Sequence, residues 1–236
     1  MKTPKPKTNL LLLTISLLTA GAASAATISY TFDTPDNISG TGAEQVYSAP
    51  DANDFGVGVS VGDFTITEAN DADFSRFVAI GGGSVEATVQ DRAGSETLSF
   101  TLTIDETVLV DLTSISFDTA YRVTLTGDST LDWGFSTILG LNAADNETSG
   151  QLLHDGGTDY QSASSGVVAL SGLTNLTNTT VTFEWEYDGS RSNLFSRTAM
   201  GLDDIVLTGT VSPIPEPSSY ALVAGGLLVS VMRRRR

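Results

Sequence analysis

The sequence contains no cysteine and a single histidine, His154, among its 236 residues. Without cysteine there is no disulfide bond, no thiol nucleophile and no cysteine metal site, so the core must hold without covalent cross-links. One histidine alone builds no zinc cluster and offers a serine nucleophile no usual base. Because His154 precedes Asp155-Gly156-Gly157, we expect it in a surface turn.

Positive charge is scarce away from the two chain ends. Of the 12 basic residues, three lysines lie near the N-terminus and four arginines end the chain, which leaves five arginines and no lysine between residues 26 and 211. That segment holds 27 of the 28 acidic residues, so its net charge is about −22. A nucleic-acid partner is excluded, because binding one requires a basic patch. Such a surface suits divalent cations, above all calcium, or serves only solubility through self-repulsion.

Helical periodicity is absent from residues 26–211, where apolar and polar residues alternate with a period of two. The alternation is clearest at residues 28–32, 64–67, 98–104, 115–117, 121–125, 131–135, 181–187 and 205–207. One apolar and one polar face per strand is typical of an antiparallel sheet that packs against a second sheet. The sequence therefore predicts an all-β fold, a single jelly-roll-like antiparallel β-sandwich of about ten strands over residues 26–211.

The first 25 residues have the layout of a secretory signal peptide. Three lysines within the first seven residues are followed by an apolar stretch at 10–20 and by small residues at Ala23-Ser24-Ala25. The apolar stretch is too short for a durable membrane span. We expect export through the Sec translocon, with cleavage after Ala25 or, as a second choice, after Ala26.

The C-terminal segment 212–236 combines three parts. Pro215, Glu216 and Pro217 form an extended rod, since the two prolines lock φ and remove backbone donors. An apolar stretch at 218–232 predicts a short transmembrane helix. Its fifteen residues fall below the roughly 20 that usually span hydrocarbon, so an ordinary buried terminal helix is the alternative. The four residues that keep the chain end from crossing the membrane are Arg233, Arg234, Arg235 and Arg236.

In this order the three parts resemble the PEP-CTERM sorting signal of exported bacterial proteins. The resemblance implies that exosortase, in the inner membrane, recognises and cleaves the tail. It also implies a precursor anchored transiently in the inner membrane and a mature form at the cell surface or in the extracellular matrix, with exopolysaccharide as a candidate partner. The resemblance covers about a tenth of the chain and does not address what the body does.

A pair of carboxylates precedes an apolar run in Gly201-Leu202-Asp203-Asp204-Ile205-Val206-Leu207. The segment resembles the closing strand of jelly-roll carbohydrate-binding modules, where a nearby carboxylate often joins backbone carbonyls around a structural calcium. The resemblance implies Asp203 or Asp204 as a calcium ligand, together with Asp33. The alternative is that the pair caps a turn before the strand.

Two further acidic segments space oxygen ligands two residues apart, a spacing that calcium loops use. They are Asp51-Ala52-Asn53-Asp54 and Asn70-Asp71-Ala72-Asp73. Neither has the downstream glycine and glutamate of an EF-hand, which favours solvated loops.

Glu184 and Glu186 flank Trp185 on one alternating strand, so both carboxylates share a face. Paired carboxylates are what glycoside hydrolysis requires. The strand lacks the longer motif of glucanase-type sandwich hydrolases, in which glutamates stand four positions apart with an aspartate between them. A polar outer face opposite a core of Phe183, Trp185 and Tyr187 is therefore favoured, and a sugar-stacking platform of these aromatics is the alternative.

The sequence favours a non-enzymatic exported protein whose body is structural, adhesive or glycan-binding. A carbohydrate-active enzyme that uses Glu184 and Glu186 is one alternative. A calcium-dependent lectin-like module is the other. No cofactor is expected beyond a structural calcium ion.

Overall fold

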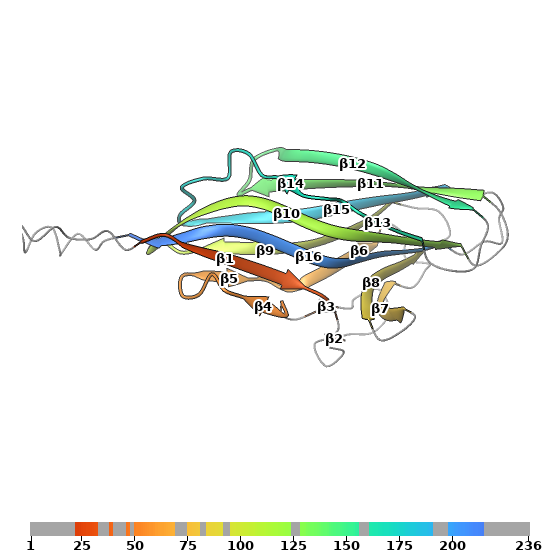
Figure 1. Ribbon diagram of the computed structural model, residues 1–236, viewed down its shortest axis with the longest axis horizontal. Coiled ribbons are helices and arrows are strands. Elements are labelled where there is room, and N and C mark those ends of the chain that lie inside the picture. Colours follow the sequence, from red (N-terminus) through yellow and green to blue (C-terminus); the bar gives the residue numbers. More distant parts are fainter. Residues whose placement is uncertain are drawn as a thin grey trace, which may run out of the picture.

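The computed structural model describes residues 22–32, 38–39, 46–47, 50–68, 75–80, 84–91, 95–123, 128–155, 161–190 and 198–214. Within these ranges the regular structure is β-strand, and the strands form two antiparallel sheets, which we call sheets A and B (Figure 1). The predicted all-β sandwich is confirmed at this level. In the described part of the chain, no helix is long and apolar enough to cross a membrane.

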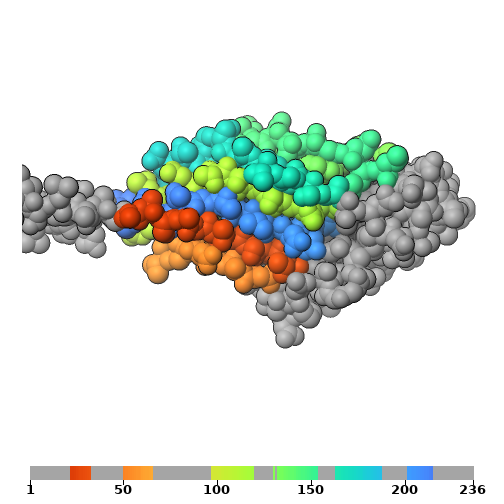
Figure 2. All heavy atoms as spheres, in the orientation of Figure 1, coloured from red at the N-terminus to blue at the C-terminus, as the bar shows by residue number. Residues whose placement is uncertain are grey.

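Sheet A has the strand order β13-β10-β16-β1-β4, with β14 paired to β10, β8 to β16 and β7 to β8. Its strands are β1 (Ser24–Tyr30), β4 (Ala52–Asn53), β7 (Ser75–Ile80), β8 (Ser84–Asp91), β10 (Val108–Val123), β13 (Gln161–Ser164), β14 (Val168–Ala169) and β16 (Thr198–Pro213). Figure 2 shows its outer face, where β10, β16 and β1 lie side by side.

Sheet B has the order β12-β11-β15-β9-β6-β3-β2, with β5 also paired to β9. Its strands are β2 (Ile38–Ser39), β3 (Val46–Tyr47), β5 (Val59–Val61), β6 (Phe64–Glu68), β9 (Ser95–Ile104), β11 (Asp128–Leu139), β12 (Ala144–Asp155) and β15 (Thr179–Ser190). The chain passes repeatedly from one sheet to the other, so neighbours in a sheet are often distant in sequence.

The core lies between the sheets and is rich in aromatic rings. Phe183, Trp185 and Tyr187 of β15 are at most 1% exposed, which confirms that this alternating face is core and not a sugar-stacking platform. From sheet A, the Phe117 ring meets the Trp185 ring edge-on, with centroids 5.4 Å apart. It also lies 5.6 Å from the Phe135 ring of β11, so Phe117 joins the two sheets. Burial of such rings supplies the stability that the missing disulfides cannot.

Trp133 is the other tryptophan, and it also faces the interior. It packs against the core while remaining partly exposed. Its ring lies edge-on to Phe117 at a centroid distance of 5.4 Å. A Cβ on Gly150, its neighbour on β12, would stand 2.5 Å from the indole, so only glycine leaves room for the ring.

The first and last strands of the body pair with each other. β1 runs antiparallel to β16 from Ser24–Val211 to Tyr30–Ile205. β16 also pairs with β10 and β8, so the last strand lies inside sheet A and not at its edge. β1 therefore begins, and β16 ends, at the same end of the sandwich, on the left in Figure 1.

Two strands extend past the boundaries expected from the sequence. Ser24 and Ala25, the last residues of the expected signal peptide, are the first two residues of β1. At the other end, β16 continues through Ser212 to Pro213, beyond the expected end of the body at residue 211. The Ile214 N–H then donates to the Thr107 carbonyl at 2.8 Å. The sandwich therefore holds the chain up to residue 214.

Candidate functional site

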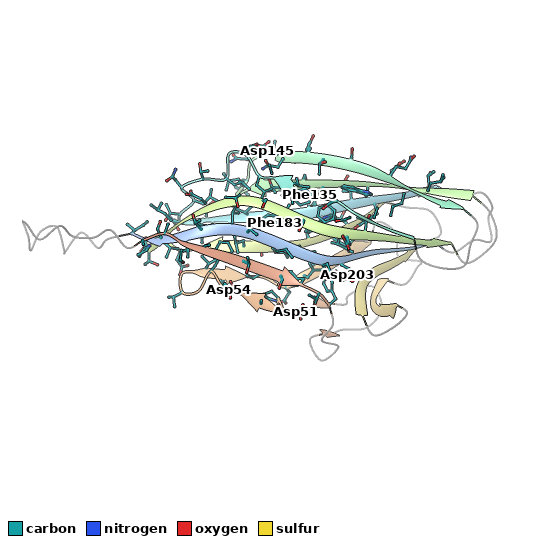
Figure 3. The ribbon with its side chains drawn as sticks, in the orientation of Figure 1. Asp51, Asp54, Phe135, Asp145, Phe183 and Asp203 are labelled. Carbon is teal, nitrogen blue, oxygen red and sulfur yellow. The ribbon has the colours of Figure 1, made fainter. Side chains whose placement is uncertain are left out.

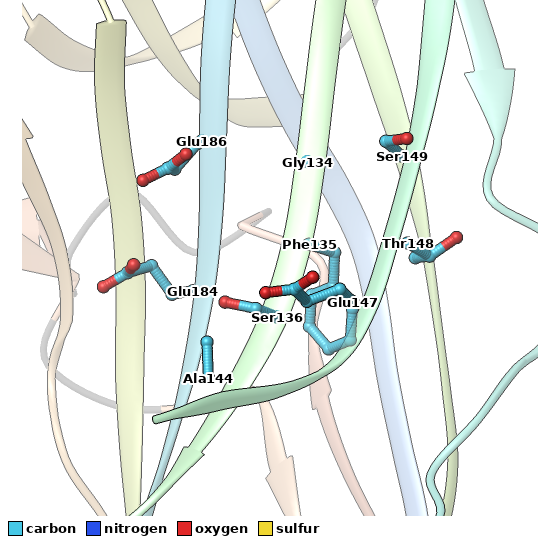
Figure 4. A pocket seen from close by; sticks show the side chains of 9 residues that line it. All are labelled: Gly134, Phe135, Ser136, Ala144, Glu147, Thr148, Ser149, Glu184 and Glu186. Atoms are coloured by element: carbon cyan, nitrogen blue, oxygen red, sulfur yellow. The ribbon is translucent and has the colours of Figure 1, made fainter. Parts of the chain in front are cut away.

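A hollow of about 490 Å³ lies on the outer face of sheet B (Figure 4). Three neighbouring strands build it: β15 supplies two glutamates, β11 the floor, and β12 a third glutamate together with Thr148 and Ser149. The lining residues are Gly134, Phe135, Ser136, Ala144, Glu147, Thr148, Ser149, Glu184 and Glu186. Because Trp185 points into the core, the alternation of the strand turns Glu184 and Glu186 outward on either side of it.

A β-bulge in β12 brings Glu147 to the hollow. Thr148 pairs with Phe135 and Asp145 with Thr137, so Asn146 and Glu147 together stand opposite Ser136 alone. Asn146 takes the left-handed backbone conformation, with φ of 54°, which asparagine tolerates better than most residues. This extra residue reorients β12 beside the hollow.

The Asn146 side chain holds the bulge in place. Its amide donates to the Thr137 hydroxyl at 2.9 Å. Its carbonyl oxygen accepts from the Ser171 N–H at 2.6 Å and from the Ser171 hydroxyl at 3.0 Å. Asn146 therefore ties β12 to β11 and to the segment that follows β14.

Gly134 forms part of the hollow between the glutamates. A Cβ built on Gly134 would meet no atom within 4 Å, and its φ lies outside the left-handed region. The absence of a side chain on Gly134 is therefore one reason that space exists here. A larger residue at this position would enter the hollow without disturbing the core.

The electrostatics of the hollow are acidic. Partial burial raises the pKa of Glu184 above its usual value of 4.5, and the neighbouring carboxylate of Glu186 raises it further. None of the nine described residues that line the hollow is basic. The site therefore disfavours anions, and it offers carboxylate acceptors and hydroxyl groups to a ligand that carries hydroxyl or amino groups.

Among the residues singled out from the sequence, the glutamate pair is brought into the site. Glu147, Ser136, Thr148 and Ser149 carry no signal of their own in the sequence. Their place in the hollow depends on the register of β11, β12 and β15 and on the bulge. His154 lies on β12 opposite Ser129 and not in a turn, and its side chain is outside the described residues.

The candidate calcium ligands Asp203 and Asp204 lie inside β16, not before it, so the expectation of a turn cap ahead of the strand is wrong. They form a second bulge, because Asp203 pairs with Asp118 while Val206 pairs with Ser116. Asp204 has a φ of 47°, and its N–H donates to the Asp203 carboxylate at 2.8 Å.

Asp33, the third candidate calcium ligand, lies outside the described residues, as do the candidate loop residues 70–73. Within the described ranges, no three histidine, aspartate or glutamate residues gather closely enough to hold a metal ion. The proposed calcium site is thus a question for experiment.

Asp51 and Asp54, which are labelled in Figure 3, flank β4 and form hydrogen bonds that attach it to β1 and to the residue after β1. The Asp51 carboxylate accepts from the Thr31 N–H at 2.6 Å and from the Thr31 hydroxyl at 3.1 Å. The Asp54 carboxylate accepts from the Thr27 hydroxyl at 2.8 Å. These two carboxylates therefore have a structural role at the edge of sheet A.

Two antiparallel sheets packed around one core make the body of this chain a β-sandwich. Among solved structures, it is similar to TmCBM61 in complex with β-1,4-galactotriose, at 11% identity over 61% of this chain and 86% of that one, with a TM-score of 0.33. It is similar to the family 11 carbohydrate-binding module from Clostridium thermocellum in complex with a β-1,3-1,4-mixed-linked tetrasaccharide, at 13% identity over 78% and 96%, with a TM-score of 0.33. CBM28, a module specific for non-crystalline cellulose, matches at 13% identity over 60% and 78%, with a TM-score of 0.35. No curated protein sequence matches the chain.

The tail gives a more specific match than the body does. A family model described as the PEP-CTERM protein-sorting motif matches residues 213–236. The recognition made from the sequence is confirmed, and the chain carries a PEP-CTERM sorting motif. The rod, the apolar stretch and the arginine cluster, residues 215–236, lie outside the described residues.

Proposed function

We propose that this is an exported surface or matrix protein, processed by exosortase, whose body binds a glycan in the hollow of sheet B. Residues 1–25 act as the signal peptide, and residues 218–232 hold the precursor in the inner membrane until the tail is cut. The repeated crossing between sheets supports the jelly-roll-like character expected from the sequence. The body has no catalytic role in this proposal.

The observation that carries glycan binding is the composition of the hollow. Its volume falls within the range of about 300–1,000 Å³ that is usual for small-molecule sites. Residues with carboxylate and hydroxyl groups line it on three strands, and such groups form hydrogen bonds with sugar hydroxyls. The acidic lining favours a neutral or amino-bearing glycan over one rich in carboxylates or sulfates.

A glycoside hydrolase is the second candidate function, and one observation favours it. Glu184 has a raised pKa beside Glu186, and a general acid next to a second carboxylate is the arrangement that glycoside hydrolysis uses. The spacing of the two glutamates lacks the sandwich-hydrolase motif, so binding without turnover is the function we propose.

Gly134→Val tests the binding site directly. The valine side chain would fill the floor of the hollow, while its β-branched shape suits a strand, so the fold should be retained. We expect binding of the purified body to a panel of neutral and amino polysaccharides to fall by about tenfold or more, the loss of roughly 1.4 kcal/mol. Thr103→Val, an exposed substitution on β9, is the matched control and should leave binding unchanged.

The same preparations separate binding from catalysis. Polysaccharide that binds the wild-type body should release no reducing ends over hours of incubation. Release that Glu184→Gln abolishes would replace the binding role with the hydrolase role. Equal binding by the wild type and Gly134→Val would remove the hollow as the ligand site.

A further inference from the structure

The end of the sandwich from which β16 leaves carries a tightly bonded group of turns. Asp105 follows β9, and its N–H donates to the Gly58 carbonyl at 2.8 Å. The Asp105 carbonyl accepts from the Thr177 hydroxyl at 3.2 Å and from the Asn178 N–H at 3.4 Å. We call this group, made of Gly58, residues 105–107 and residues 177–178, the exit platform.

The sorting motif begins on the exit platform. The match to the motif starts at Pro213, which is the last residue of β16 and pairs with Val108. The Ile214 N–H donates to the Thr107 carbonyl at 2.8 Å, and Pro215 is the next residue. The Pro215-Glu216-Pro217 rod therefore follows the folded body without a flexible linker.

The length of the rod sets how close a recognising protein must come. Three residues reach at most about 11 Å, whatever their conformation. A protein that grips all three residues therefore comes within about that distance of the folded body, because Ile214 is bonded to Thr107. Its surface then either fits the exit platform or pulls the end of β16 away from β10.

We propose that the exit platform is a docking surface for the membrane peptidase that processes the tail. The inference rests on the proposed exosortase processing and adds a second contact to it. Asp105, Glu106 and Thr107 are exposed on the turn that bonds Ile214. The partner surface is therefore basic or polar, and the bond between Ile214 and Thr107 fixes the point at which the chain leaves the body.

A spacer that repeats part of the motif tests the docking. Gly-Ser-Gly-Ser-Pro-Ile is inserted between Ile214 and Pro215 in the full-length chain, so the body keeps its own last two residues. A second Pro-Ile then precedes Pro215, and the motif and everything after it are unchanged. The half-life of the precursor is measured by pulse-chase in cells that carry the processing peptidase.

We expect the spacer to lengthen the precursor half-life about tenfold, the effect of losing one good docking contact. An unchanged or shorter half-life would overturn the proposal, because the peptidase would then act on the rod alone or be hindered by the body. Glu216→Ala separates this outcome from failure of the proposed function. If Glu216→Ala is processed normally, exosortase recognition itself fails, whereas a blocked Glu216→Ala with an unaffected spacer variant removes only the docking surface.

Discussion

Among the residues that the structure describes, two polar atoms lie in the core without a hydrogen bond. Of the described side chains, the Trp185 indole nitrogen and the Tyr187 hydroxyl are buried and have no partner. An unsatisfied buried donor costs about 1–3 kcal/mol, and burying a phenolate would cost more. Burial accordingly raises the pKa of Tyr187 above its usual value of 10.0. The Tyr187 hydroxyl thus lowers the stability of the body, although its ring helps to build the core.

Tyr187→Phe should stabilise the body, because it removes the unsatisfied hydroxyl and keeps the ring. We expect the free energy of unfolding at pH 7 to rise by about 1 kcal/mol. Because the pKa of Tyr187 is raised in the folded state, only the unfolded wild type loses this proton just above pH 10. The free energy of unfolding of the wild type therefore falls by roughly 1.4 kcal/mol per pH unit there. Urea unfolding at pH 7 and pH 11 should therefore show the advantage of Tyr187→Phe widening with pH.

Tyr30→Phe is the control for that measurement. The Tyr30 hydroxyl donates to the Gly62 carbonyl at 3.2 Å, so removing it breaks a hydrogen bond. The variant should be destabilised at neutral pH. If Tyr187→Phe behaves like Tyr30→Phe, the Tyr187 hydroxyl has a partner in solution.

Asp204 is a candidate calcium ligand, and it also occupies a left-handed backbone position. Separate substitutions test these two roles. Its backbone lies at a φ of 47°, which asparagine tolerates and valine does not. We predict that millimolar calcium raises the free energy of unfolding of the body, by up to about 2.7 kcal/mol at a hundredfold excess over Kd. The melting temperature of the body should rise accordingly. Asp204→Asn should abolish the calcium effect and leave the fold intact. Asp204→Val should destabilise the body by roughly 1–2 kcal/mol whether or not calcium is present.

Sodium chloride at matched ionic strength is the control for the calcium melt. A net charge near −22 repels itself, and any salt screens that repulsion. Equal melting temperatures in calcium and in sodium would therefore contradict a specific site. The acidic surface would then serve solubility alone.

At the scale of the element, alternation predicted the strands and their core faces well. Phe183, Trp185 and Tyr187 are buried because a period of two fixes the side on which each residue lies. The hollow was predicted only in part, since Glu147 comes to line the same hollow as Glu184 through strand pairing that no local pattern encodes. The bulges at Asn146 and at Asp203 and Asp204 were missed for the same reason: a bulge is an irregularity between two strands, and neither strand shows it alone.

β1 allows an element-scale prediction about processing. A body that begins at Ala26 should be as stable as one that begins at Ala22, because the exposed Ser24 and Ala25 contribute only two edge pairings. A body that begins at Thr31 lacks the fully buried Ile28 and Tyr30 and should show no cooperative melt. Each lost core residue costs about 2–5 kcal/mol, against a total stability of about 5–15 kcal/mol.

Thermal melts of the three fragments, followed by circular dichroism, measure this effect. N-terminal sequencing of the exported protein should find Ala26 at its start. A marked loss of stability in the fragment that starts at Ala26 would contradict cleavage after Ala25, because export would then weaken the fold.

At the scale of the whole molecule, the two ends of the body are adjacent, and this arrangement affects the rate of folding. The pairing of Ser24 with Val211 closes a loop that contains nearly the entire body. Such pairings form slowly, because loop-closure entropy is lost before the contact forms. If both proposed hydrophobic segments hold the precursor in the membrane, the start of β1 and the end of β16 would lie at one membrane surface. The two strands would then find each other in two dimensions, which would shorten the time during which unpaired strand edges are open to aggregation.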